Sequence, residues 1–413
     1  MNLKKLSRYA IILVLIISAS VFFPRFYHKI VDKSTRSPII YYSPVIEDFA
    51  YFQHTGGHTA FKDGEGNNYN RKGYEKLLPF LYYRDLDKWG VLPDTIQGVP
   101  TDITSIRHNS QRIRLRAYNL DQPTIDLYPL FESQSDYTNL SYPPELFRIN
   151  KRMEFVTAHT NKINEKMSRQ FTKDLKENGF EFPAQLIAGN PTTRKPFDEG
   201  YFIVDNKGSV FHLKKVQDSP QCVKTPIDKN LNIRKIVISE SVRREIYGFM
   251  ITESDDVYLI SYDNYKLIKL PLKNYNPDKM DISFYADPVY RTFKYDDNYN
   301  YHAVVFDSNY TFIDSMKISL TPEEEKLSTK VKQALFPFEI KTMKSFSSLL
   351  HFDLKFQSWL SLIGILISLG IGIFVKIKRK ENIKENWFDF VLILVGGIYG
   401  LLGVIFIKPD IWD

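Results

Sequence analysis

Residues 356–375 read FQSWLSLIGILISLGIGIFV, an apolar run without a charged side chain. A second run, residues 387–407, reads WFDFVLILVGGIYGLLGVIFI, and Asp389 is its only charged residue. A helix of about 20 apolar residues crosses a bilayer core of about 30 Å. Each run therefore predicts one transmembrane helix, and the rest of the chain is organised around them.

A third apolar run, residues 9–24, lies near the N-terminus and is shorter. The small residues Ser18 and Ser20 suit a signal peptidase, so a cleaved signal peptide is one interpretation. The run continues through Phe22 and Phe23, which favours an anchor that is retained. Both interpretations predict that the segment after this run is exported.

Basic residues beside the apolar runs predict the orientation. The head, residues 1–8, carries three cations and no acid. The loop 376–386 carries five, namely Lys376, Lys378, Arg379, Lys380 and Lys384. Because an excess of Lys and Arg stays in the cytoplasm, we expect the head and this loop inside the cell. The main domain, residues 36–345, and the tail, residues 408–413, are then expected outside.

Composition argues against nucleic acid as a partner. The net charge is +7, and most of it comes from the head and the inner loop. Binding of nucleic acid needs a basic face, which leaves the outer domain a poor candidate. The single cysteine, Cys222, excludes an intramolecular disulfide. The 30 Phe and 26 Tyr supply apolar area and favour strands.

A hairpin pattern recurs in the outer domain. Residues 202–211 read FIVDNKGSVF, residues 249–258 read FMITESDDVY, and residues 305–312 read VFDSNYTF. Each is an apolar strand, a polar turn and a second strand, and residues 61–69 show a fainter version. A recurrence every 40–50 residues or so is typical of β-propeller blades. An ordinary antiparallel sheet would give similar hairpins, so we predict a β-rich domain that is propeller-like in one interpretation.

Three passages with helical spacing make the expected class α+β. Residues 70–89 begin at a capping Asn70 and are divided by Pro79. Residues 160–179 have an apolar side chain at every fourth position and end at a glycine. Residues 321–335 begin with TPEE, a cap followed by proline and two acids.

Two polar motifs match metal sites only in part. His54 and His58 are four residues apart, but the two glycines between them disfavour a helix, and surface histidines in a loop are the favoured interpretation. Asp63, Glu65 and Asn67 alternate as calcium ligands do, yet the glutamate that closes an EF-hand is missing. We predict no metal and no cofactor.

No catalytic residue is predicted either. Cys222 and His212 could serve as a nucleophile and a base, but nothing in the sequence orients them, and a lone cysteine usually fills a core. The chain lacks G-x-S-x-G, a phosphate-binding glycine loop and H-E-x-x-H. Pairs of carboxylates leave little trace in a sequence, so an enzyme is disfavoured and not excluded.

Small residues at a spacing of four mark the two C-terminal runs. They are Gly364, Ser368 and Gly372 in the first run and Gly396 and Gly400 in the second, where Gly403 flanks the pair. Such residues let helices approach closely in a bilayer. The helices could pack on each other as a hairpin, or present a docking face to another membrane protein. No charged residue lies near the middle of a run, which disfavours an ion path.

Several stretches resemble recurring segments of a known family: residues 77–86, 130–133, 190–205 and 247–267. The family consists of inner-membrane proteins of Gram-negative anaerobes, about as long as this chain, and is described only as a domain of unknown function. The resemblance implies a bacterial inner-membrane protein with a periplasmic domain. It also implies an ABC transporter as neighbour, because members tend to be encoded beside such components. The family has no assigned catalytic residues.

We therefore expect a non-enzymatic accessory subunit. Its outer domain would bind a ligand or partner, and its C-terminal helices would dock on the membrane subunit of a transporter within the lipid bilayer. The expected partners are the permease and ATPase subunits of an ABC transporter. One alternative is a periplasmic hydrolase that uses carboxylates such as Asp63, Glu65 or Asp205. Another is a sensor that signals inward, although the inner loop 376–386 is small for an output domain.

Overall fold

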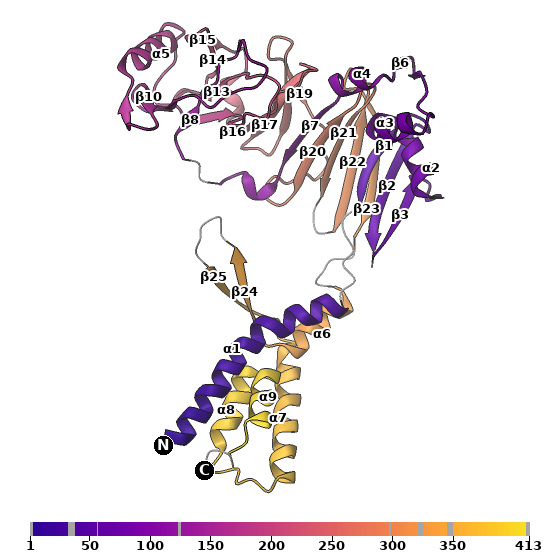
Figure 1. The fold of residues 1–413 in the computed structure, drawn as a ribbon, viewed down its shortest axis with the longest axis vertical. Coiled ribbons are helices and arrows are strands. Elements are labelled where there is room, and N and C mark those ends of the chain that lie inside the picture. Colours follow the sequence, from indigo (N-terminus) through magenta and orange to yellow (C-terminus); the bar gives the residue numbers. More distant parts are fainter. Residues whose placement is uncertain are drawn as a thin grey trace. The chain divides into compact units, whose positions relative to one another are not determined.

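The computed structural model describes residues 3–31, 38–55, 57–122, 125–296, 299–320, 325–344 and 350–409. These residues form two compact units (Figure 1). The larger unit lies within residues 37–53 and 59–319. The smaller unit lies within residues 1–36, 54–58 and 320–413.

The larger unit is built from antiparallel sheets of consecutive strands. The first sheet, in the order β1-β2-β3-β4, contains Ile39–Ser43, Asp48–Thr55, His58–Asp63 and Asn68–Tyr69. The second, in the order β11-β10-β9-β8, contains Lys162–Ile163, Met153–Thr157, Glu145–Ile149 and Tyr128–Pro129. The third runs β12-β13-β14-β15, with Leu186–Gly189, Tyr201–Val204, Val210–Val216 and Ser219–Lys224.

Two further sheets are also antiparallel, and the second of them includes one strand from far upstream. The fourth runs β16-β17-β18-β19, with Ile233–Ile238, Ile246–Thr252, Val257–Ser261 and Leu267–Lys269. The fifth runs β23-β22-β21-β20-β7, with Phe312–Ser319, Asn300–Phe306, Arg291–Asp296, Asp281–Ala286 and Gln111–Leu115. A two-stranded sheet pairs β5 (Thr95–Ile96) with β6 (Val99–Pro100).

The predicted β-rich class and its hairpins are confirmed. Residues 202–211, 249–258 and 305–312 are the hairpins β13–β14, β17–β18 and β22–β23. A four-stranded meander is also the pattern of a propeller blade. Across the described ranges, however, no closed propeller or barrel is found. The fifth sheet instead takes its edge strand β7 from far upstream in the chain, with Ile113 opposite Phe284.

Neighbouring sheets bury apolar faces against each other. Phe249 and Leu259 of the fourth sheet share a core with Phe284 and Phe293 of the fifth. The second and third sheets enclose a core with α5 (Glu165–Glu177), whose Phe171 packs on Phe155 with the ring centroids 4.7 Å apart. Aromatic pairs in this edge-on geometry contribute beyond the area they bury. The abundant Phe and Tyr thus hold the sheets together.

The short helices confirm part of the sequence interpretation. Asn70 caps α2 (Arg71–Leu77) by accepting a hydrogen bond of 2.7 Å from the Gly73 amide, and α3 (Pro79–Lys88) begins at the predicted break. Another short helix, α4 (Ile103–His108), follows β6.

The later helix starts are different. The helix expected from residue 160 starts at Glu165 with Asn164 as its cap, because the preceding residues form the turn into β11. The described part of the next helix, α6, is Leu327–Leu335. The expected cap, residues 321–324, lies outside the described residues.

The smaller unit contains α1 (Leu3–Val31), the hairpin β24 (Phe338–Lys344) and β25 (Leu350–Phe356), and α7 (Ser361–Lys378). By length and composition, α1 and α7 could each cross a membrane. The predicted boundaries shift. The helix α1 continues past Pro24, and residue 356 ends a strand, so the second candidate span starts at Ser361.

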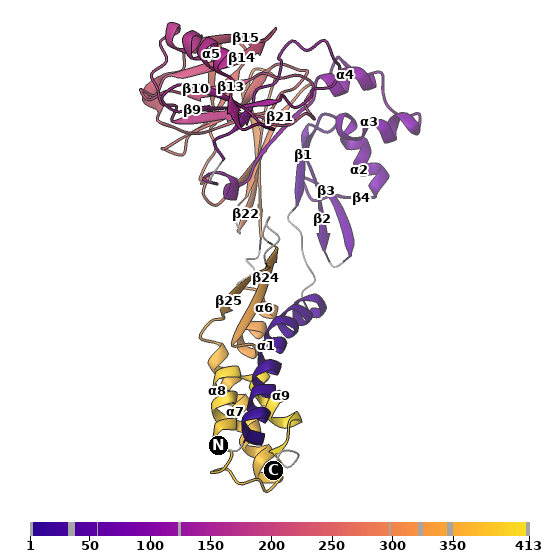
Figure 2. The ribbon, with the colours of Figure 1, turned by 60° about the vertical axis from the view of Figure 1, so that its left-hand side comes forward.

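Residues 387–407 are not one helix, which corrects the prediction. They form α8 (Trp387–Gly396) and α9 (Ile398–Phe406), separated by Gly397 at φ +53° and ψ −127°. Only glycine adopts this backbone conformation readily. The two helices lie side by side with α1 and α7 in both views (Figures 1 and 2). Each measures about 15 Å at 1.5 Å per residue, half of a bilayer core.

The end of α9 returns to the start of α8. The Arg8 guanidinium contacts both the Asp389 carboxylate, at 2.8 Å, and the Ile407 carbonyl, at 2.9 Å. A straight helix would separate these two residues by about 27 Å. The chain therefore leaves α9 at the end of the unit where the head lies. The tail was expected on the opposite side, and the reversal at Gly397 is the reason for the difference.

This hairpin predicts matched accessibility for the inner loop and the tail. Single cysteines placed at Lys384 and Lys408, both exposed, should react alike with a membrane-impermeant maleimide in right-side-out vesicles, and alike again in inverted ones. Wild-type protein, whose Cys222 is buried, is the background control. Opposite labelling of the two cysteines would show that residues 387–407 cross the bilayer.

Candidate functional site

The six small residues predicted as a packing or partner face lie inside the smaller unit. A side chain at Gly396 would meet Ile16 at 3.1 Å, and one at Gly403 would meet Ile12 at 2.7 Å, both on α1. One at Gly372 would meet Ile393 of α8 at 2.7 Å.

The other three members of this set are also covered. Gly364 lies against the Ala334 carbonyl of α6, Gly400 lies against the Leu392 carbonyl, and Ser368 is buried. These residues therefore serve packing within the chain, where helices need close approach. They are therefore not accessible to a partner protein.

A buried ionic centre joins the same helices. The Asp389 carboxylate accepts two hydrogen bonds from the Arg8 guanidinium, at 2.8 and 3.0 Å, and one oxygen lies 2.7 Å from the Lys376 ammonium. None of the three side chains is more than 2% exposed. Lys376 also pairs with Glu381 at 2.6 Å. Arg8 from α1, Lys376 from α7 and Asp389 from α8 are thereby fixed together.

Sequence reasoning missed this centre because Arg8 and Lys376 were interpreted only as orientation signals. The available signal was Asp389 itself, since an acid within an apolar run needs a partner. Which cations would reach it could not be read from the sequence, because Arg8 lies 381 positions away.

The candidate metal ligands do not form a metal site. His54 lies near the end of β2, and His58 begins β3. Gly56, between them, lies outside the described residues. Within the described ranges, no group of three or more His, Cys, Asp or Glu is arranged to hold a metal ion. The Asp63 carboxylate accepts hydrogen bonds from the Asn67 amide at 2.8 Å and the Tyr69 hydroxyl at 2.8 Å. It therefore closes the β3–β4 turn.

Other candidate catalytic groups also have structural roles. Asp205 accepts hydrogen bonds from the backbone amides of Lys207 and Ser209, at 2.9 and 2.8 Å, and so closes the β13–β14 turn. Glu65 lies in the β3–β4 turn and accepts a hydrogen bond from the Asn67 side chain at 3.3 Å. These contacts do not bring the three carboxylates of the hydrolase interpretation to one place.

Cys222 and His212 do not face each other. Cys222 lies opposite Leu213 in the β14–β15 pair and packs into the core of the third sheet, whereas His212 bonds to the Tyr265 hydroxyl at 3.0 Å. Burial raises the pKa of the Cys222 thiol to about 12 and lowers the pKa of His212 to about 3. Neither a thiolate nor a base is available here near neutral pH.

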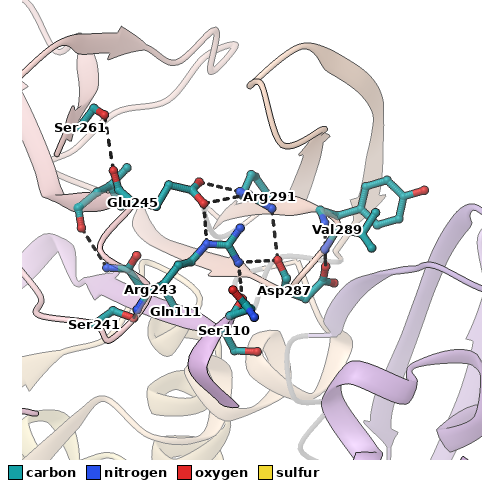
Figure 3. Close-up of polar contacts among 12 residues, drawn as sticks. Ser110, Gln111, Ser241, Arg243, Glu245, Ser261, Asp287, Val289 and Arg291 are labelled. Atoms are coloured by element: carbon teal, nitrogen blue, oxygen red, sulfur yellow. Dashed lines mark hydrogen bonds and ion pairs between the residues drawn. The ribbon is translucent and has the colours of Figure 1, made fainter. Parts of the chain in front are cut away.

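A second polar network joins the fourth and fifth sheets (Figure 3). Glu245, just before β17, accepts two hydrogen bonds from Arg291 at the start of β21, at 2.7 and 2.8 Å. Arg243 and Tyr310 donate to the same carboxylate, at 2.5 and 2.6 Å. Because Glu245 and Arg243 lie in the β16–β17 loop of the fourth sheet and Arg291 lies in the fifth, this carboxylate fixes one sheet against the other.

Asp287 closes the β20–β21 turn beside this network. Its carboxylate accepts hydrogen bonds from the Val289 and Tyr290 amides, at 2.8 and 2.6 Å, while its own carbonyl accepts from Arg243 at 2.7 Å and Arg291 at 3.2 Å (Figure 3). The side chain is buried, and burial raises the pKa of Asp287 to about 6.

A cavity of about 560 Å³ opens next to the network and is the candidate binding site. Residues 80–85 of α3 form one wall, Arg107 of α4 and Ser110 form the next, and Arg112 of β7 and Tyr285 of β20 form the base. Arg243 donates a hydrogen bond to the Asn109 carbonyl, next to Ser110, so the network supports this wall. Sequence analysis did not find the cavity, because its walls come from four elements.

Comparison with known proteins gives a family and no activity. Residues 39–306 match the family described as Domain of unknown function (DUF4857), which confirms the resemblance to a family of that kind. No curated protein matches the chain. The matched region contains all the walls of the cavity.

Removal of the central carboxylate should destabilise the smaller unit. Asp389→Asn removes the carboxylate partner of Arg8 and one of the two carboxylates beside Lys376, which keeps Glu381, and breaking a buried ion pair in this way costs about 3–5 kcal/mol. Thermal unfolding in detergent, followed by helical circular dichroism, measures the loss. Glu177→Gln, which removes the exposed pair with Lys173 at 3.6 Å, should cost less than about 1 kcal/mol. An equal effect of the two substitutions would contradict a central role for Asp389.

The Asp287 carboxyl predicts a pH dependence. Its pKa is near 4 in the unfolded chain and about 6 in the folded one, so the folded state binds the proton more tightly. The resulting stabilisation is fully present below about pH 4 and is lost as the pH rises to about 6. Asp287→Asn should therefore raise the free energy of unfolding at pH 7.5 by up to about 3 kcal/mol relative to wild type, with little change at pH 4.

Unfolding midpoints of the full-length chain across this pH range provide the measurement. Asp307→Asn is the matched control, because Asp307 closes an exposed turn with the same type of bonds, to the amides of Asn309 and Thr311. It should change stability by less than about 0.5 kcal/mol. A destabilised Asp287→Asn at pH 7.5 would contradict a raised pKa of the Asp287 carboxyl in the folded chain.

Proposed function

This chain belongs to the DUF4857 family, and we propose that it is a non-enzymatic, membrane-anchored binding subunit that accompanies an ABC-type transporter. The larger unit would bind a ligand in the periplasm of a Gram-negative bacterium. The smaller unit would hold it in the inner membrane next to the permease and the ATPase.

The outward face of α7 is the observation that carries this proposal. Leu366, Phe374 and Ile377 are 68%, 64% and 61% exposed, and the helix is long enough to span a bilayer. An exposed apolar surface of this extent is unfavourable in water and suits lipid or a membrane partner. The charged side chains Arg8, Lys376 and Asp389 are meanwhile buried against one another.

The orientation proposal rests on lysines outside the ionic centre. Lys378, Lys380 and Lys384 are exposed in the inner loop, and an excess of cations there favours a cytoplasmic location. With α8 and α9 folded back, the tail would share that side. Two crossings, α1 and α7, would then place the larger unit in the periplasm.

Binding is favoured over catalysis by the roles of the candidate groups. Asp63 and Asp205 close turns, Cys222 lies in a core, and His212 is held by Tyr265. The cavity beside α3, in contrast, is open and lined by polar and aromatic side chains. Pockets of this size and lining suit a small ligand.

The transporter contact would use the outward face of α7, since the small residues are covered within the chain. We expect full-length tagged protein, purified in mild detergent from its native host, to retain a permease and an ATPase in comparable amounts. The double variant Leu366→Ala and Phe374→Ala should lose them, because it removes apolar contacts from this face.

Val14→Ala with Phe22→Ala is the matched control, because these α1 side chains are similarly exposed, at 61% and 66%. It should keep the partners. Recovery of full-length protein without any transporter component would overturn the accessory role. Retention by both double variants would move the contact away from α7.

A further inference from the structure

The cavity of the larger unit carries three arginines and one acid. Arg84, Arg107 and Arg112 line it, together with Asp85. All three arginines are exposed, and none forms an ion pair with a carboxylate of the described residues. Most other arginines of the larger unit are paired, such as Arg291 with Glu245 and Arg152 with Glu165.

Three guanidinium groups against one carboxylate leave a surplus of about two positive charges. Guanidinium groups bind phosphate and carboxylate oxygens through paired hydrogen bonds. A ligand with two negative charges on one group would balance the surplus. A phosphate monoester has this charge near neutral pH, whereas a carboxylate or a phosphate diester has a single negative charge.

The arginines are positioned by the elements that carry them and by neighbouring rings. The Arg112 guanidinium carbon lies 4.9 Å from the centre of the Tyr285 ring, and that of Arg84 lies 5.7 Å from the Tyr83 ring. Such contacts orient a guanidinium and leave its N–H groups available. Arg107 comes from α4, whose first turn is fixed by the Asp102 cap at 2.8 Å.

Further cations lie on the same face of the fifth sheet. One face of the sheet carries Arg112 and Arg114 of β7 and Lys294 of β21. Ser283 and Tyr285 of β20, the strand between β7 and β21, lie on the same face. Burial, with Arg112 and Arg114 nearby, lowers the pKa of Lys294 to about 7. Arg114 is paired with Asp281 at 2.8 Å. Arg112, which lines the cavity and has no such carboxylate partner among the described residues, is therefore the cation of this face that is placed to meet a ligand.

Aromatic side chains complete the lining. Phe80, Tyr82, Tyr83 and Tyr285 contribute rings or hydroxyls to the wall. Rings of this kind pack on the flat or apolar face of a sugar or an aromatic group. The cavity thus offers one charged region and one apolar region.

We propose that this cavity binds a small phosphate monoester, with Arg84, Arg107 and Arg112 around the phosphate and the partly exposed rings of Tyr82 and Tyr83 against the attached ring. The inference names the ligand class for the binding role proposed above and rests on that role. It does not depend on which transporter the chain accompanies.

Calorimetric titration of the full-length protein in phospholipid-free detergent tests the proposal, with phenyl phosphate as the probe. Phenyl phosphate should bind, and benzoate and methyl phenyl phosphate, which carry a single charge, should bind at least about tenfold more weakly. The phosphate diester also stands for the headgroup of a membrane lipid. Equal affinity for the three probes would overturn the assignment of a dianion.

Variants locate the site. Arg107→Gln and Arg112→Gln should each weaken phenyl phosphate by about tenfold or more, the effect expected for losing one charged hydrogen bond. Arg169→Gln, on the exposed side of α5, is the control and should bind as wild type does. Unchanged affinity in both cavity variants would place the phosphate elsewhere.

A variant that gains affinity distinguishes loss of a phosphate contact from loss of folding, because a misfolded protein would not bind more tightly. Asp85→Asn removes the one acid of the wall and should tighten phenyl phosphate by about two- to fivefold. Weaker or unchanged binding in this variant would contradict the charge argument. Absence of phenyl phosphate binding together with intact transporter association would overturn this inference and leave the proposed subunit role standing. Binding of phenyl phosphate without transporter association would overturn the proposed subunit role and leave the phosphate site standing.

Discussion

A carboxylate that is removed from water needs cations at hydrogen-bond distance, and the smaller unit is arranged around one such group, that of Asp389. Its partners come from the first helix and from the end of α7. The charges are buried, so the free energy of separating them is large compared with that of a surface pair. The ionic centre therefore fixes α1 against α7 and α8, together with the apolar packing of Ile12 and Ile16 on the C-terminal helices.

The reversal at Gly397 depends on the same contact. A helix that ran straight through residues 387–407 would carry Ile407 far from Arg8, whereas the folded hairpin gives Arg8 both a carboxylate and a carbonyl to bind. Glycine at residue 397 permits the turn, and Gly400 permits the close approach of the two helices. A run with the composition of a membrane span is thus divided into two helices, and each of them is too short to cross a bilayer.

In the larger unit, largely buried ion pairs likewise join separate elements, which here are sheets and not helices. Glu245 fixes the fourth sheet to the fifth through Arg291, and Lys195 pairs with Asp198 at 2.5 Å and Glu240 at 2.8 Å, linking the third sheet to the fourth. Aromatic side chains fill the layers between these points. The arginines of the cavity have no such carboxylate partner among the described residues, whereas the buried charges at these links are paired. For this reason the cavity arginines suggest a ligand and the buried charges do not.

The sequence by itself determined the local elements: the hairpin around Asp205, the cap at Asn70, the break at Pro79 and the apolar character of the two long helices. Each depends on residues a few positions apart, so turn chemistry, capping and periodicity were sufficient. The tertiary structure alone decided that β7 joins β20, that Arg8 meets Asp389, and that Arg84, Arg107 and Arg112 surround one cavity. These contacts join distant parts of the chain, and they arise from packing and charge pairing that no local pattern specifies.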